Sequence, residues 1–181
     1  MSVNHPGYAW HKFGLLASHI RNDTRSIGIV TQPFEKHGNR KQDYKTGKKD
    51  TVLACKQISS ALVDYLQLSF PSARIRLRNN ANESVALAYS RMIVAKQTVV
   101  GGVSTFGVLA ALASMGQAVI IAPDFPKAPG KWLLQWEEIK KSDSDVIMLH
   151  DPHPLLLPQA NYLWWKAHAG QKAMMEWLIR G

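Results

Sequence analysis

The segment that most constrains the fold is a glycine-containing stretch between two apolar runs, Gln97–Gly116. An apolar strand over residues 98–100 is followed by Gly101 and Gly102, and a helix capped by Ser104 then runs to the last glycine of the segment. Such a unit points backbone N–H groups and the positive end of a helix dipole at one spot, which suits an anion such as a phosphate. A strand–helix unit with no ligand fits the pattern equally, because neither G-x-G-x-x-G nor G-x-x-x-x-G-K-[ST] is present.

Composition limits the class of protein and of partner. The 181 residues are 46% hydrophobic and 19% charged, which is typical of one globular domain with a sizeable core. The formal net charge of +9 predicts an anionic partner: a nucleotide diphosphate, an anionic membrane surface or nucleic acid. Signatures of RNA-recognition and zinc-finger modules are absent, so nucleic acid is the least favoured. No apolar run is long enough for a transmembrane segment. Cys55 is the single cysteine, which excludes intramolecular disulfides.

Apolar periodicity and turn residues predict strands and helices that alternate from residue 26 onward. The predicted strands are 26–31, 73–78, 98–100, 118–122 and 145–149, and the predicted helices are 10–20, 50–70, 82–95, 104–116, 131–141 and 162–179. Asn82 is expected to cap the third helix, with Val85, Ala88/Tyr89, Met92 and Ala95 facing inward. The alternation predicts an α/β domain with a mainly parallel sheet covered by helices on both faces. Residues 1–25 precede the core of 26–150, and a loop and helix over 151–181 close the chain.

Two polar segments follow the carboxyl ends of predicted strands. One is the Gly101–Thr105 turn, and the other is a basic loop over 35–49. The loop carries Lys36, Arg40, Lys41, Lys45, Lys48 and Lys49. Ligands of parallel α/β sheets bind beyond the carboxyl ends of the strands, so the two segments are expected to converge on one anion.

The stretch Asn82–Gly107 is similar to part of a known family. It contains an acidic residue that opens a helix, an apolar strand, and a Ser-Thr-Phe turn at the head of the next helix. In these features it resembles the donor-binding lobe of fucosyltransferase-like glycosyltransferases of the GT-B type. The similarity extends more loosely from Ile27 to Trp132, over half the chain. It implies a three-layer, Rossmann-like fold.

The resemblance also implies a function and a site. The function is binding of a nucleotide sugar, a GDP-fucose-like donor, for transfer to a glycan or glycoprotein acceptor. The implied donor site has the diphosphate at Ser104 and Thr105, within a turn that also includes Gly102 and Phe106. The resemblance implies that no metal is needed at the reacting centre. No catalytic base is identified.

Two further side chains belong to the implied site, each with an alternative interpretation. Glu83 is implied to lie near the nucleoside, but an acid in the first turn of a helix also complements the helix dipole. Arg91 is implied to neutralise the diphosphate, but a mid-helix arginine is also a common solvated side chain.

The chain departs from the family at its first motif, His-x-Arg-x-Gly-Asp. Only His19-Ile-Arg21-Asn22-Asp23 is similar, and it lacks the glycine and sits at the end of a predicted helix, where a turn is the alternative. The motif is otherwise expected upstream of Met1, in an N-terminally shortened glycosyltransferase. A full-length relative is expected in the secretory pathway, and a complete chain of this sequence in the cytoplasm. The alternative functions are a nucleotide- or anion-binding domain without catalysis and a basic nucleic-acid-associated protein.

Two groups near the C-terminus have a ligand-binding and a structural interpretation. His150 and His153 flank Asp151 as metal ligands would, but the adjacent prolines predict a rigid turn. Three tryptophans, Trp164, Trp165 and Trp177, suit stacking on a sugar, but their helical spacing predicts packing.

Overall fold

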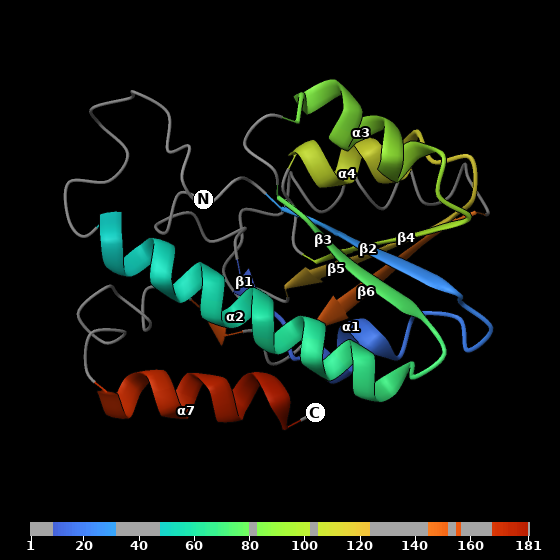
Figure 1. Cartoon of the computed structure of the whole chain (residues 1–181). Helices are drawn as coiled ribbons and strands as arrows, with labels where there is room; N and C mark the ends of the chain where they lie inside the picture. Colours follow the sequence, from blue (N-terminus) through green and yellow to red (C-terminus); the bar gives the residue numbers. More distant parts are fainter. Residues whose placement is uncertain are drawn as a thin grey trace. The chain divides into compact units, whose positions relative to one another are not determined.

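The computed structural model describes residues 9–31, 48–79, 83–101, 105–123, 145–151, 155–156 and 168–180 (Figure 1). The chain divides into two compact units. The first unit comprises Met1–His11 and Tyr89–Gln159, and the second comprises Lys12–Ala88 and Ala160–Gly181. Strands and helices alternate in both, as the sequence predicts, and the fold is α/β and Rossmann-like. None of the described helices combines the length and the apolar character that a membrane span requires.

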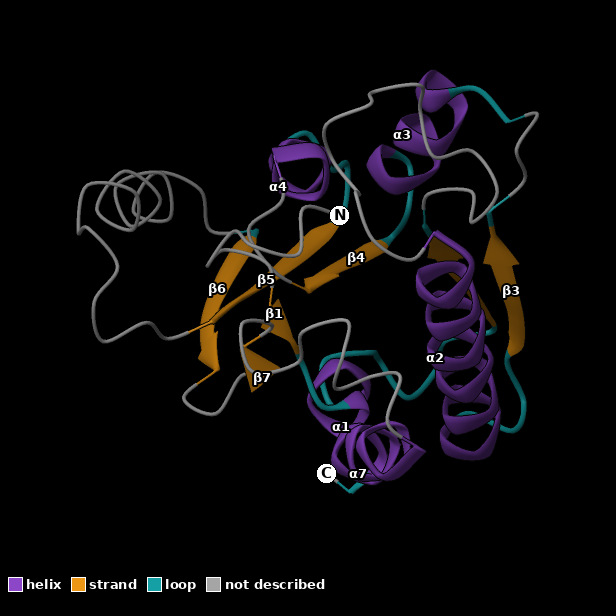
Figure 2. Ribbon diagram, turned by 90° about the vertical axis from the view of Figure 1, so that its left-hand side faces the viewer, coloured by secondary structure: helices purple, strands orange, loops and turns teal. Residues whose placement is uncertain are grey.

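The first unit contains a parallel sheet in the order β4-β5-β6 (Figure 2). Its strands are β4 (Gln97–Gly101), β5 (Gln117–Pro123) and β6 (Val146–Asp151). The apolar residues of β5 are almost wholly buried, as expected of a central parallel strand. One core cluster joins the sheet to α4 (Thr105–Leu112), and its buried members are Val100, Val108, Ala111, Ala118, Ile120 and Val146. The predicted strands at 98–100, 118–122 and 145–149 are confirmed; the first two are one residue longer at each end, and the third starts one residue later and ends two residues later.

Two glycines allow α4 and the turn after it to pack closely on β4. A Cβ atom at Gly107 would lie 2.7 Å from a methyl group of Val100. A Cβ atom at Gly116 would lie 2.3 Å from the backbone oxygen of Lys96. Gly116 therefore belongs to a tight turn, and the prediction that the helix extends to it is wrong, since α4 ends at Leu112.

Helix α3 (Val85–Ile93) differs from its prediction in its start and in its buried face. The Ser84 hydroxyl accepts a hydrogen bond from the Leu87 N–H at 3.1 Å and caps the helix, whereas Asn82 lies outside the described residues. No residue of α3 is buried, and Val85 is 74% exposed, so the predicted inward position of Val85 is wrong. The Thr98 hydroxyl donates to the Met92 carbonyl at 2.8 Å and ties the end of α3 to β4.

The structure corrects two predictions near the ends of the chain, the first helix and the loop at 150–154. Strand β1 (Ala9–Trp10) pairs with β7 (Leu155–Leu156), with Trp10 opposite Leu155. The predicted first helix over 10–20 therefore begins too early and ends too late, because residue 10 is extended and α1 covers only Phe13–Ala17. The predicted loop at 150–154 is also wrong at its start, since His150 and Asp151 continue β6 in register with β5.

The second unit pairs β2 (Ser26–Val30) with β3 (Arg74–Arg78) in parallel. Helix α2 (Lys48–Ser69) packs on β3 of this pair; it begins two residues before the predicted helix over 50–70 and ends one residue before its predicted end. The core cluster contains Ala17, Leu66, Phe70 and Ala73, with Ile27, Ile29, Leu62 and Ile75 packed against it.

The C-terminal helix is α7 (His168–Ile179). Its Trp177 makes a cation–π contact with Lys12, whose Nζ lies 5.9 Å from the ring centre. That contact favours packing for Trp177; residues 131–141, Trp164 and Trp165 lie outside the described residues.

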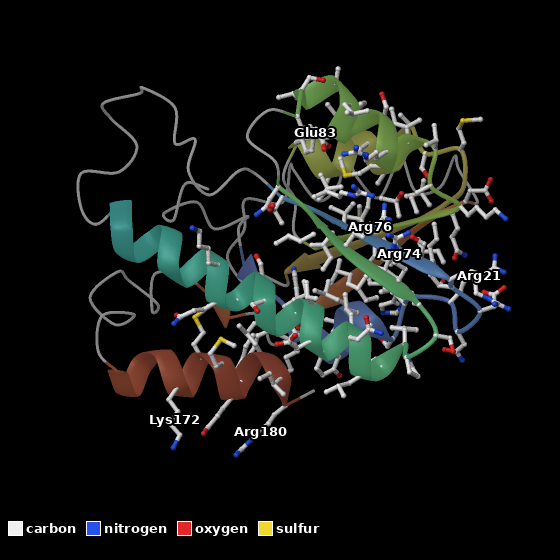
Figure 3. The ribbon with its side chains drawn as sticks, in the orientation of Figure 1. Arg21, Arg74, Arg76, Glu83, Lys172 and Arg180 are labelled. Carbon is white, nitrogen blue, oxygen red and sulfur yellow. The ribbon has the colours of Figure 1, made fainter. Side chains whose placement is uncertain are left out.

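Arginines alternate with apolar residues along β3 (Figure 3). Ile75 faces the core cluster, so Arg74, Arg76 and Arg78 share the other face of the strand. The positive charge of Arg74, with smaller contributions from burial and from Arg78, lowers the pKa of Arg76. This face therefore concentrates positive charge on the second unit.

Candidate functional site

The candidate site is the carboxyl edge of the β4-β5-β6 sheet in the first unit. Strand β4 leaves this edge at Gly101, and its neighbour β5 extends two residues further, to Pro123. Asp151 is paired with Pro123 and ends β6. Because neighbouring strands lie about 4.8 Å apart, β4 and β6 are about 10 Å apart across β5. In parallel α/β sheets this edge is where ligands bind.

The turn between β4 and α4 is only partly described. Gly102 and Ser104 lie outside the described residues, and Thr105 is the first residue of α4. Phe106 follows on the helix, is 38% exposed, and packs edge-on against Tyr89 with 5.6 Å between ring centres. The predicted strand and helix are therefore present, and the roles of Gly102, Ser104 and Thr105 at a ligand stay predictions.

Glu83 and Arg91 lie at opposite ends of α3. Glu83 is half-buried, precedes the helix and belongs to the second unit (Figure 3), so its expected place near the nucleoside stays a prediction. Arg91 is half-buried and lies in the last turn of α3, where a cation complements the helix dipole. This interaction with the helix dipole explains the position of Arg91 without a ligand, and a contact between Arg91 and a diphosphate stays a prediction. Residues 36–47 of the basic loop lie outside the described residues.

The His19–Asp23 segment is a turn in the second unit. Arg21 donates two hydrogen bonds to Asp23, from Nε at 3.0 Å and from Nη2 at 2.8 Å. The carboxylate raises the pKa of Arg21, and both side chains are exposed. The turn is confirmed, but α1 already ends at Ala17, so the segment is not the end of the helix; Arg21 lies in this turn before β2.

At the carboxyl end of β6, a buried histidine meets a buried aspartate. His11 follows β1 directly and is 4% exposed, and Asp151 is 5% exposed. The two atoms His11 Nδ1 and Asp151 Oδ2 are 2.7 Å apart. A carboxylate accepts hydrogen bonds, so Nδ1 carries the proton and donates it to Oδ2. The bond fixes the tautomer of His11 and leaves Nε2 as the second functional atom of the ring.

Burial determines the charge of His11. Loss of hydration lowers the pKa of His11 below its ordinary value of 6.5, and the hydrogen bond and the charge of Asp151 only partly oppose this effect. The imidazole is therefore neutral at pH 7, and its Nε2 is a hydrogen-bond acceptor. Nε2 is buried and has no hydrogen-bond partner among the described residues. An acceptor in this state suits a ligand that brings a hydroxyl or another donor.

The pair was not predictable from sequence spacing. His11 and Asp151 are 140 residues apart, and the sequence analysis placed His11 in a helix and Asp151 in a turn. The available signal was an aspartate at the end of an apolar strand, because the carboxyl ends of parallel strands carry functional groups. His153 lies outside the described residues, and the described residues hold no cluster of three or more His, Cys, Asp or Glu side chains suited to a metal.

Comparisons with protein-family models, curated proteins and solved structures found no match to this chain. The carboxyl edge of the β4-β5-β6 sheet is therefore the feature of the molecule that indicates a function.

Proposed function

We propose that the first unit binds a nucleotide-sugar donor of the GDP-fucose type, with its diphosphate at the turn between β4 and α4. The observation that carries this proposal is a strand that ends in Gly101, at the carboxyl edge of a parallel sheet, with a helix that starts four residues later at Thr105. This is the arrangement that binds phosphates in many α/β proteins.

The glycines of this unit support the proposal. Gly101 and Gly102 leave the turn without side chains, so a phosphate can approach the backbone closely. Gly107 brings α4 against Val100, which keeps the N-terminus of the helix beside the end of β4. In dinucleotide-binding turns, one glycine likewise permits close packing of helix on strand. The net charge of +9 adds a general attraction for a diphosphate.

The proposed chemistry is glycosyl transfer with GDP as the leaving group. Negative charge grows on the diphosphate as the sugar departs, and N–H groups at the start of α4 stabilise it without reorganising. Ser104 and Thr105 follow the two glycines in the sequence after Val103, and in this proposal their hydroxyls donate hydrogen bonds to the same diphosphate oxygens. The acceptor is a hydroxyl of a glycan or glycoprotein.

A second candidate function rests on the arginine face of β3. Arg74, Arg76 and Arg78 form a positively charged strand face that suits a nucleic-acid backbone. This candidate predicts binding that falls steeply with salt and does not distinguish nucleotides. A nucleotide-binding domain without catalysis is the third candidate, and it predicts selective GDP binding without turnover.

Calorimetric titration with GDP, ADP and UDP at two salt concentrations tests the proposal. Selective binding of GDP supports a donor site, and equal, salt-sensitive binding of all three contradicts it. Ser104→Ala and Thr105→Ala together remove about two hydrogen bonds to a charged oxygen, each worth roughly 1.5–3 kcal/mol, so the affinity for GDP should fall at least tenfold. Ser60→Ala, on the exposed side of α2, is the matched control and should leave the affinity unchanged. Unchanged affinity in the double variant would move the site elsewhere.

A further inference from the structure

We infer that His11 and Asp151 form the proton-accepting site of the first unit, with His11 Nε2 taking the proton from the hydroxyl that attacks the donor sugar. This inference rests on the proposed function. The residues that carry it are the buried pair at the end of β6 and its unpartnered ring nitrogen.

The first argument is the hydrogen-bonding state of the pair. Asp151 holds the Nδ1 proton at 2.7 Å, so the lone pair is on Nε2, as a general base requires. Leaving a buried acceptor without a donor is unfavourable, because the acceptor loses its hydrogen bonds to water and gains none in return. A fold tolerates such a group most readily where a ligand supplies the donor, and the hydroxyl of an acceptor sugar, or water, is such a donor.

The second argument is position. His11 and Asp151 lie at the carboxyl edge of the sheet, at the end of β6, and the proposed diphosphate site lies beyond β4 at the same edge. The two strands are about 10 Å apart. The proposed base and the proposed diphosphate site therefore belong to the same edge of one sheet, on strands that flank β5.

The step balances within the groups named. The hydroxyl oxygen forms a bond to the anomeric carbon, and the bond from that carbon to the diphosphate oxygen breaks, with its electron pair leaving on GDP. The hydroxyl proton moves to His11 Nε2. Asp151 keeps its charge, orients the ring and stabilises the imidazolium, which then releases its proton to solvent. No oxidant, reductant or metal enters the balance.

A purely structural role is the competing explanation, in which the pair only fastens the segment after β1 to the end of β6. The two roles differ in pH dependence. Among the described residues, Asp151 is the charged group that faces His11. A base must be neutral to accept a proton, so the rate should fall as the pH drops through the lowered pKa of His11 and level off above it. A purely structural role for the pair predicts no fall in the rate as His11 is protonated.

The test compares wild type with His11→Gln in two measurements: the dissociation constant for GDP, and the release of GDP from GDP-fucose with water as the acceptor. The inference predicts at least a hundredfold slower release in His11→Gln, loss of the low-pH limb, and GDP affinity within twofold of wild type. Asp151→Asn, which keeps the shape but alters the tautomer, should slow release as well. His168→Gln, at the start of α7, is the control for loss of an imidazole elsewhere.

The outcomes separate the inference from the proposed function. Retained GDP affinity identifies a folded variant, so equal rates in wild type and His11→Gln would overturn the inference and leave the donor site standing. GDP binding with no release of GDP by wild type would also overturn it, because water is a hydroxyl nucleophile. Failure of wild type to bind GDP would contradict the proposed function, and the inference with it.

Discussion

The charge state assigned to His11 makes a signed prediction about stability. Burial lowers the pKa of His11 below the value of 6.5 expected in the unfolded chain. Between those two pKa values the unfolded state binds a proton that the folded state does not, so stability rises with pH across this window. The stability that His11 contributes is fully present above pH 6.5 and is lost as the pH falls through its folded pKa.

The perturbation is His11→Gln, which removes the imidazole, its hydrogen bond to Asp151 and its titration. The rise is at most about 1.4 kcal/mol per pH unit, because one proton is involved. At pH 7–8 the loss of one well-made buried hydrogen bond sets the difference between wild type and variant at about 1–3 kcal/mol. That difference should shrink as the pH is lowered from 6.5 towards 5.

Urea unfolding at several pH values, followed by circular dichroism, measures the difference. Taking wild type minus variant at each pH cancels the carboxylates that both chains share. A difference that grows as the pH falls would show that His11 is an imidazolium in the folded chain. Its Nε2 would then be a donor and not an acceptor, and the assignment of a base would be refuted.

Two further predictions test the packing. Gly116→Ala should destabilise by about 2–4 kcal/mol, because the new methyl group meets a rigid backbone oxygen. Gly107→Ala should cost less, about 0–2 kcal/mol, because it meets a side chain and gains helix propensity; thermal unfolding that ranks the two variants in the opposite order contradicts this account of the turn. On α2, Leu66→Ala should cost about 2–5 kcal/mol because Leu66 is 3% exposed. Leu68→Ala should stay within about 0.5 kcal/mol because Leu68 is 83% exposed; equal effects in urea unfolding would contradict the assigned face.

The sequence predicted the regular part of the fold well. Strands β5 and β6 were found from apolar runs, because parallel strands buried in a sheet are apolar along much of their length. Strands β2 and β4 were also found from their apolar residues, although β2 has no buried residue and only alternate residues of β4 are buried. The end of α2 was also found, from the Phe70-Pro71 boundary. Periodicity is a local signal, and these elements are determined locally.

Long-range pairing explains the errors. Residues 9 and 10 become a strand only because they pair with residues 155 and 156, and no local signal indicates a partner so distant. Gly116 was interpreted as the end of a helix, whereas its contact with the Lys96 backbone places it in a turn. Val85 fits the apolar period of α3, yet it is 74% exposed, and no described residue of this helix is buried. An apolar period alone does not show whether a neighbouring element covers the apolar face.

The candidate site also has one part that local sequence predicts and one part that it does not. The strand that ends at Gly101 and the helix that starts at Thr105 are close in sequence and are predicted in the correct order. The pair of His11 and Asp151 joins residues far apart in the chain and required the structure. Burial, the tautomer and the unpartnered Nε2 are properties of the folded site and leave no trace in sequence spacing.

The central claim is that the first unit binds a guanine-nucleotide sugar at the turn between β4 and α4. The measurement that tests it most directly is calorimetric titration of the intact chain with GDP, with ADP and UDP as controls. The account predicts selective binding of GDP that weakens at least tenfold when Ser104 and Thr105 are both replaced by alanine. No binding of GDP, or equal and salt-sensitive binding of all three nucleotides, would contradict it.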